Sequence, residues 1–482
     1  MEKSLTATIL LALSIWSSAA EPASLGVLIP VQQGEAVATR PGPGGQPLPI
    51  LRAAPDDPLL RALMAESRRG AVAFALKLDE QAQRVSGQAP QPSWLLLTEE
   101  EGGFAQRGFW LRRSGRDRLV DQPYVALVTD SASIRDGSFE EIFAHELGHV
   151  LLRRVLPRLP AGMSRLRHGS LTVTDDPTAL DEGFAIHFQA LSRLLTVNPA
   201  LKLHDAGLGD KAFTPLWQSN VDGTFRIDGV RRNGFIHRQL LPPGDEDIAA
   251  RRANSSAFDV ATLKNGNQML ASEGVVATLF YRALAHRPSV ARYTSLFRAL
   301  QRLNRRDLQP DSPLIPLLVQ DWILTDPPQG RRFLQIFVET TYGATIESAL
   351  PQATGALARV GRIGQQAEFV QQLGPAREQL AALIGRATRQ PALLTAALGP
   401  ALWLAAKGPL VVNLNTAEAD QLAALDGTLA GFAEKIVAER DAHGPYQSLD
   451  ELVQRDGLAS PLLSTLSELA AQASALGTYQ RL

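Results

Sequence analysis

The chain has 482 residues, a hydrophobic fraction of 45% and a formal net charge of −1. This length and composition are typical of a globular protein with two or three domains. The near-neutral charge excludes a protein that is basic over its whole surface, as many nucleic-acid binders are. The absence of cysteine excludes disulfides, a lipoprotein anchor and thiolate metal sites.

The N-terminus has the pattern of a signal peptide. Lys3 precedes an apolar run at residues 7–16, and the small residues at 18–20 provide a cleavage site. The run is shorter than a membrane-spanning helix, and no later stretch of about 18 apolar residues occurs. We therefore expect residues 1–20 to be a cleaved signal peptide, with a retained membrane anchor as the alternative. The mature protein would be exported, periplasmic or extracellular in a bacterium, and without a transmembrane segment.

The next elements predict a small sheet. Residues 21–55 are rich in proline and glycine, which predicts a flexible lead-in. Spaced leucines predict a helix at 57–87. Apolar runs at 94–98 and 108–112, separated by acidic residues and glycines, predict a hairpin, and a third strand is expected at 124–129.

The pattern His-Glu-x-x-His follows this sheet, in an amphipathic segment that predicts a helix. Ser138 and Glu141 predict a capping box at the helix start. Histidines four residues apart lie on one helix face, so His145 and His149 can bind the same zinc ion. Glu146 lies beside them, where a carboxylate can accept a proton from a zinc-bound water molecule.

A catalytic zinc ion usually has three protein ligands and keeps a fourth position for water. Glu182, in the sequence Asp-Glu-Gly-Phe-Ala, is the candidate third ligand. With these motifs, residues 90–190 resemble the gluzincin metallopeptidases, whose second helix carries a glutamate ligand, often as Glu-Gly-x-Ala. The resemblance implies zinc as the cofactor and a zincin-like endopeptidase or aminopeptidase that hydrolyses peptides or proteins. It also implies an edge strand that binds extended substrate by backbone pairing.

Several assignments stay open. Glu273 begins a second Glu-Gly-x-x-Ala sequence and is the alternative third ligand. Asp181 either orients a zinc-ligating histidine as a hydrogen-bond acceptor or caps its own helix. His187 is expected in the core. The connection at 156–168 carries arginines and His168, and we expect a solvated loop, with a basic subsite for acidic substrates as the alternative.

The rest of the chain predicts three further regions. Residues 201–262 are polar and turn-rich, which predicts a loop-rich insertion. Spaced aliphatic residues predict a mostly helical region at 263–408 and a small all-α module at 409–482. The expected fold class is therefore α+β. A zincin-like catalytic half at 56–200, with a small mixed sheet and zinc helices, precedes these regions.

The module resembles the helix-hairpin-helix domain of competence (ComEA-type) DNA receptors over residues 411–472, beginning with Val-Asn-Leu-Asn-Thr-Ala. That family binds DNA phosphates through backbone N–H groups of a Gly-x-Gly hairpin. Here Gly427 matches the first glycine, and Leu429 replaces the second. Residues 409–482 contain four Lys or Arg and ten Asp or Glu, which leaves six surplus negative charges. We therefore expect the module to pack, or to bind a protein partner, and not to bind DNA.

The motifs together predict an exported zinc metallopeptidase. His145, His149 and Glu182 would be the metal ligands and Glu146 the general base. The alternative is an exported DNA-binding or scaffold protein that uses its helix-hairpin-helix module and has a structural or inactive zinc site. Metal content and the charge of the module distinguish the two.

Overall fold

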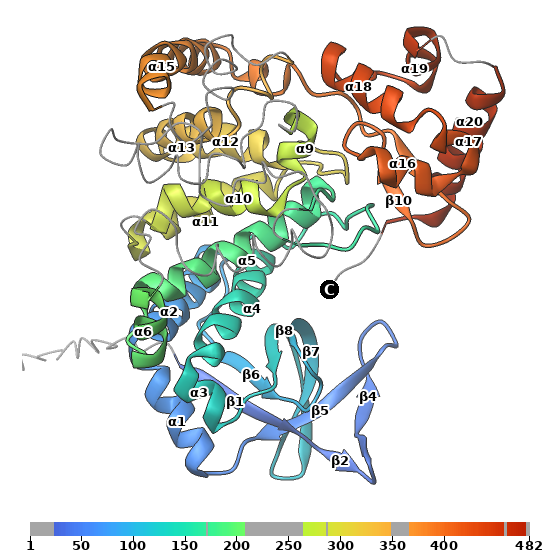
Figure 1. Ribbon diagram of the computed structural model, residues 1–482. Helices are drawn as coiled ribbons and strands as arrows, with labels where there is room; N and C mark the ends of the chain where they lie inside the picture. The colour runs from blue at the N-terminus through green and yellow to red at the C-terminus, as the bar shows by residue number, and fades with distance from the viewer. Residues whose placement is uncertain are drawn as a thin grey trace, which may run out of the picture.

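The computed structural model describes residues 24–169, 172–207, 264–285, 288–348, 366–456 and 460–478. The expected signal peptide and residues 208–262 of the expected insertion lie outside these ranges. No helix within them is long and apolar enough to cross a membrane. Figure 1 shows the sheet at one end of the molecule, helices stacked against it, and the C-terminal module beside the helices.

The N-terminal half contains a curled sheet. Its strands are β1 (Leu25–Pro30), β2 (Gln32–Gln33), β3 (Ala36–Val37), β4 (Thr39–Pro41), β5 (Pro47–Ala53), β6 (Ser93–Leu97), β7 (Gly103–Arg113) and β8 (Arg116–Leu127). Six of them pair in the order β1-β6-β8-β7-β5-β4, and β1 also pairs with β5, which closes the sheet toward a barrel. Successive side chains alternate between faces. Leu96 and Ala126 therefore belong to a cluster within the sheet, whereas Leu95 and Val125 pack against the helices.

Two predictions about this sheet are wrong. Residues 25–53 form strands and not a flexible lead-in, because β1 pairs in parallel with β6 and β5 in parallel with β7. The hairpin expected between residues 94–98 and 108–112 does not form, since β6 pairs with β8. The hairpin joins β7 to β8 through Ser114 and Gly115, with φ angles of 47° and 76°. Such positive angles give a two-residue turn whose twist matches that of the strands.

The helices before the module, apart from the one at Pro199–Gly207, share one hydrophobic core with the outer face of the sheet. The helices before the module are α1 (Pro58–Glu66), α2 (Gly70–Val85), α3 (Ser131–Asp136), α4 (Ser138–Val155), α5 (Asp176–Leu195), α6 (Pro199–Gly207), α9 (Gly266–Leu270), α10 (Glu273–Phe280), the π-helical η4 (Tyr281–Ala285), α11 (Val290–Leu303), α12 (Leu314–Thr325), α13 (Pro327–Thr340), α15 (Gln366–Arg389) and the 3₁₀ turn η5 (Pro391–Thr395). The single helix expected at 57–87 is divided into α1 and α2. Gly70, with a φ of 56°, lies at the break.

Helix α4 begins at Ser138, as predicted, but not through the predicted capping box. Its N-cap is Gly137, whose φ of 89° is left-handed, and Ser138 Oγ donates to Asp136 Oδ1 at 2.8 Å. The reciprocal capping box belongs to α3, where Asp130 accepts from the N–H of Ser133. The short helix α3 therefore determines where α4 starts.

The C-terminal module has its own hydrophobic core, which includes the fully buried Leu429. Its elements are β9 (Trp403–Ala405), β10 (Val411–Asn413), α16 (Ala419–Leu425), α17 (Gly427–Ala430), α18 (Ala433–His443), α19 (Leu449–Asp456) and α20 (Ser460–Leu476). The all-α composition expected for it is wrong, because β9 and β10 form an antiparallel ribbon. That pairing also brings residues before 409 into the module. The α+β class predicted for the whole chain is confirmed.

The module packs against the rest of the chain, as predicted, through buried polar contacts. Gln268 of α9 donates from Nε2 to the main-chain oxygen of Thr416 at 3.0 Å. The N–H of Arg165, in the connection between α4 and α5, donates to the oxygen of Val411 at 3.2 Å. The second contact attaches the module to the connection that carries His168.

Helices α4, α5 and α10 approach one another closely at two glycines. A Cβ on Gly148 would lie 2.8 Å from the Cα of Ala185, and a Cβ on Gly183 would lie 2.7 Å from the Cβ of Val276. Both distances are shorter than van der Waals contact, so neither position has room for a side chain. The Glu-Gly-x-Ala sequence of α5 thus supplies one small residue to each contact.

We expect Gly183→Ala to destabilise the protein by about 1–3 kcal/mol, because the added methyl group must push α10 away from α5. Urea unfolding measures the change. The matched control is Gly385→Ala on α15, where the nearest atom to an added Cβ is 3.6 Å away. Alanine should stabilise that helix by about 0.5–1 kcal/mol. A neutral or stabilising effect at position 183 would contradict the close packing.

Candidate metal centre

Helix α4 presents both histidines of the motif on one face. The ring centroids of His145 and His149 are 5.1 Å apart, with an angle of 79° between the ring planes. Both side chains are partly buried, whereas Glu146 between them is 7% exposed. The helical period predicted from the sequence therefore brings the two imidazoles together at the edge of the core.

Helix α5 adds Glu182 to this pair. Glu182 Oε2 lies 3.7 Å from His145 Nε2 and 3.6 Å from His149 Nε2. One donor atom from each of the three residues falls within 4.8 Å of the others. Within the described ranges, the group that holds both histidines contains Glu182 and not Glu273. Of the two candidates for a third ligand, the structure places Glu182 at the histidines.

Asp181 hydrogen-bonds to the ring of His149 and is not the N-cap of α5, the helix on which it lies. Its Oδ1 lies 2.8 Å from His149 Nδ1, and its Oδ2 accepts from Arg153 at 2.6 Å. The N-cap of α5 is Asp175, whose side chain accepts from the N–H of Thr178. An aspartate on Nδ1 makes that nitrogen the donor, so the Nε2 lone pair of neutral His149 points toward Glu182. The sequence left both roles of Asp181 open, and the geometry selects the orienting role.

The charged side chains at this site shift one another's pKa values. Burial lowers the pKa of His149, but the charge and hydrogen bond of Asp181, with the charge of Glu182, outweigh it and raise this pKa to about 9. Burial raises the pKa of Glu182, but the histidines outweigh it and lower this pKa to about 2. Without a metal ion, the pair is therefore an imidazolium beside a carboxylate at neutral pH.

The side chain of Glu146, on α4, faces the first residues of β7. A Cβ on Gly103 would lie 3.0 Å from Glu146 Cγ and Oε1, so only glycine allows this approach. The N–H of Ala105 is close enough to lower the pKa of Glu146 slightly. Burial raises the pKa of Glu146, and the two histidines partly offset the effect. A carboxylate with a raised pKa, close to the histidines and outside their group, is a suitable general base.

The start of β7 is an open sheet edge. Residues 103–107 pair with β8, from Gly103 opposite Leu127 to Arg107 opposite Pro123. On the other side of β7, pairing with β5 involves only Trp110 and its neighbour within the described residues. The segment beside Glu146 therefore has one backbone edge without a strand partner among the described strands, which is the requirement for binding an extended peptide.

His168, which was expected in a solvated loop, lies beside the candidate metal centre. Its Nδ1 lies 3.7 Å from Glu182 Oε1 and 3.4 Å from Glu273 Oε1. These three residues form a second group with one donor atom each within 4.8 Å. No local motif marks His168, because its neighbours come from α5 and α10. A histidine inside an arginine-rich connection was the only signal available.

His187 lies in the core, as expected. It is fully buried, and its Nε2 lies 3.0 Å from the hydroxyl of Tyr293. Burial lowers the pKa of His187 to about 3, so the ring is neutral. This pair is a buried hydrogen bond between α5 and α11.

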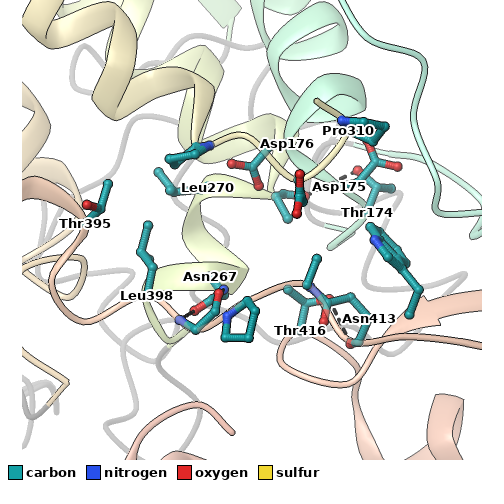
Figure 2. A pocket seen from close by; sticks show the side chains of 17 residues that line it. Thr174, Asp175, Asp176, Asn267, Leu270, Pro310, Thr395, Leu398, Asn413 and Thr416 are labelled. Carbon is teal, nitrogen blue, oxygen red and sulfur yellow. Dashed lines mark hydrogen bonds between the residues drawn. The ribbon is translucent and has the colours of Figure 1, made fainter. Parts of the chain in front are cut away.

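A pocket of about 250 Å³ lies elsewhere, where the start of α5, α9 and the C-terminal module meet (Figure 2). Asp175, Asp176, Asn267 and Thr416 are among its lining residues. None of the residues of the two histidine groups lines it. The pocket therefore marks the contact of the module with the rest of the chain and not the candidate metal centre.

We expect a divalent metal ion to bind the first group more tightly as the pH rises toward 9. His149 is protonated below its pKa of about 9 and must lose that proton to become a ligand. Each binding event then releases one proton from this group, and affinity rises about tenfold per pH unit below pH 9. Calorimetry of zinc binding in buffers with different ionisation enthalpies counts the protons.

The control for this prediction is Asp181→Asn, which removes the charge that raises the pKa of His149. It should reduce the number of protons released at about pH 8. Equal proton release by the variant and the wild-type chain would contradict the assignment of the proton to His149.

Comparisons with known proteins found a match to one part of the chain. Residues 410–468 match the helix-hairpin-helix motif family. Neither the curated proteins nor the solved structures contain a match to the chain. The C-terminal module is therefore a helix-hairpin-helix domain.

Proposed function

We propose that the protein is an exported, zinc-dependent metallopeptidase of gluzincin type. The observation that carries the proposal is the convergence of His145 Nε2, His149 Nε2 and Glu182 Oε2, with Glu146 beside them. Two imidazole nitrogens and one carboxylate oxygen are a donor set of catalytic zinc sites. Donors about 2 Å from a tetrahedral ion are about 3.3 Å apart. The separations of 3.6 and 3.7 Å therefore fit zinc with a small adjustment.

Zinc, when bound, supplies Lewis-acid chemistry, which lowers the pKa of water and polarises a carbonyl group. The residues of the chain supply the rest. Glu146 accepts a proton from water and returns it to the leaving amine, and its raised pKa suits both transfers. Asp181 fixes the ring of His149 and is fixed in turn by Arg153. Glu146 is 7% exposed, so little bulk water reaches it.

Peptide is the substrate class that the surroundings favour. An extended peptide can add to the open edge of β7 by main-chain hydrogen bonds, which do not depend on side-chain identity. Gly103 lies against Glu146, so a peptide bond at this position would be beside the general base. We describe the domain as zincin-like because an open edge strand lies beside the two helices that would bind the metal ion.

Export is a proposal that rests on the N-terminal residues. The expected signal peptide at 1–20 would place the peptidase in the periplasm or outside the cell. Mass spectrometry of the exported chain would test it, because cleavage leaves Glu21 as the first residue.

We expect Glu146→Gln to abolish proteolysis while the chain keeps its zinc. Glutamine has the same shape but does not accept the proton, and loss of a general base costs on the order of 10²–10⁴ in rate. Cleavage of a fluorogenic peptide library measures activity, and elemental analysis measures zinc. The matched control is Glu140→Gln, a buried glutamate of the same helix that accepts from Thr196 and lies outside both histidine groups.

Near wild-type cleavage by the Glu146→Gln variant would sink the proposed mechanism. Loss of zinc from that variant would also count against it, because Glu146 would then be a ligand. A loss of activity in the Glu140→Gln control would show that the loss in Glu146→Gln is not specific to the proposed base.

Duplex DNA binding by the module is the second candidate function, because helix-hairpin-helix domains generally bind DNA. The cations of the module argue against it. Arg440 is 1% exposed and donates to main-chain oxygens within the module. Arg455 pairs with Glu451. These two arginines are engaged within the module, and Leu429 fills the core at the place of the second hairpin glycine.

We expect the full chain to show no duplex binding at about 0.15 M salt, because the six surplus negative charges of residues 409–482 repel the phosphates. Fluorescence anisotropy with a labelled duplex measures binding at several salt concentrations. Micromolar affinity that falls steeply with salt would contradict the expectation. If such binding appears, its loss in Lys435→Ala would assign it to the module.

A further inference from the structure

A second cluster of metal-binding side chains lies directly beside the first. His168, Glu182 and Glu273 each place one donor atom within 4.8 Å of the other two. They come from the connection after α4, from α5 and from α10. The proposed peptidase mechanism uses neither His168 nor Glu273, so the cluster requires an explanation of its own.

Glu182 belongs to both clusters, and its two oxygen atoms face different partners. Oε2 is the atom near His145 and His149, at 3.7 and 3.6 Å. Oε1 is the atom near His168, at 3.7 Å. A carboxylate with one oxygen toward each of two ligand groups has the geometry of a bridge between two metal ions. Such paired ions lie about 3.5–4 Å apart in two-metal sites.

The charges of the cluster favour a cation. Glu182 is 8% and Glu273 1% exposed, and their oxygen atoms lie within the same 4.8 Å group. Two buried carboxylates at this distance repel each other unless positive charge lies between them. His168, with 46% of its side chain exposed, can compensate as an imidazolium or can bind a metal ion through its lone pair. A divalent ion compensates both carboxylates at once.

The surrounding backbone holds the three residues in place. Val173 forms an antiparallel bridge with Ser272, the residue before Glu273. The N–H of Thr174 donates to the oxygen of Ala271 at 2.8 Å. The connection that carries His168 is therefore attached to the start of α10. The contact of Gly183 with α10 fixes Glu182 against the same helix end.

We propose that His168, Glu182 and Glu273 bind a second divalent cation, with Glu182 bridging it to the ion of the first site. One imidazole and two carboxylates suit zinc, manganese or cobalt(II). The inference rests on the proposed function, because the bridge needs an ion held by His145 and His149. In the alternative arrangement, a protonated His168 pairs with both carboxylates. The chain would then bind one metal ion, and the test below distinguishes the two.

The test counts zinc in the full chain after loading and exhaustive dialysis against metal-free buffer. We expect about two equivalents in the wild-type chain and about one in Glu273→Gln, which keeps the shape but removes a ligand. His168→Gln should also retain about one, and its partly exposed side chain makes misfolding a smaller risk. Glu140→Gln is the control for a buried glutamate and should keep both ions. Circular dichroism checks that each variant is folded.

Cobalt(II) supplies a second readout that does not depend on activity. Two cobalt ions joined by a carboxylate couple magnetically, so the paramagnetic resonance signal per ion should be weaker in the wild-type chain than in Glu273→Gln. One equivalent in the wild-type chain, unchanged in Glu273→Gln, would overturn the second site and leave the proposed function standing. No bound metal at all would overturn both. Two equivalents that persist in both variants would show that other residues hold the second ion.

Discussion

The close approach of α4, α5 and α10 is the constraint on which the candidate site depends. Gly148 lets α4 contact the backbone of α5 at Ala185, and Gly183 lets α5 contact α10 at Val276. Helices packed at this distance bring side chains from three separate segments within a few ångströms of one another. Glu182, next to Gly183, is therefore positioned by backbone contacts and not by a flexible loop.

This packing concentrates charge in a place where charge is costly. Glu146, Asp181, Glu182 and Glu273 are each 8% exposed or less, so their carboxylates have little water around them. Buried carboxylates need hydrogen bonds and cations, or they shift their protonation instead. Asp181 obtains both from His149 and Arg153. Glu182 lies beside His145 and His149, and Glu273 lies beside His168, which is the arrangement that the proposed metal centre requires.

Within the described part of the helix-hairpin-helix domain, buried charge serves internal contacts and does not gather at one site. Leu429 is fully buried in its hydrophobic core, and Arg440 donates hydrogen bonds to main-chain oxygens inside the domain. Gln268 and Arg165 attach it to the helical half at two points. Among the described residues, the domain therefore uses Arg440 for its own main-chain contacts, and Arg165 ties it to the connection that carries His168.

Local patterns in the sequence determined the α+β class, the helix-hairpin-helix domain and the pair of His145 and His149, because helical period and capping chemistry act within a few residues. Tertiary structure alone decided three matters. It selected Glu182 over Glu273 at the histidines, it placed His168 beside both glutamates, and it converted residues 25–53 into sheet strands. Each depends on contacts between segments distant in the chain, and such contacts follow from how helices and strands pack, which no local pattern encodes.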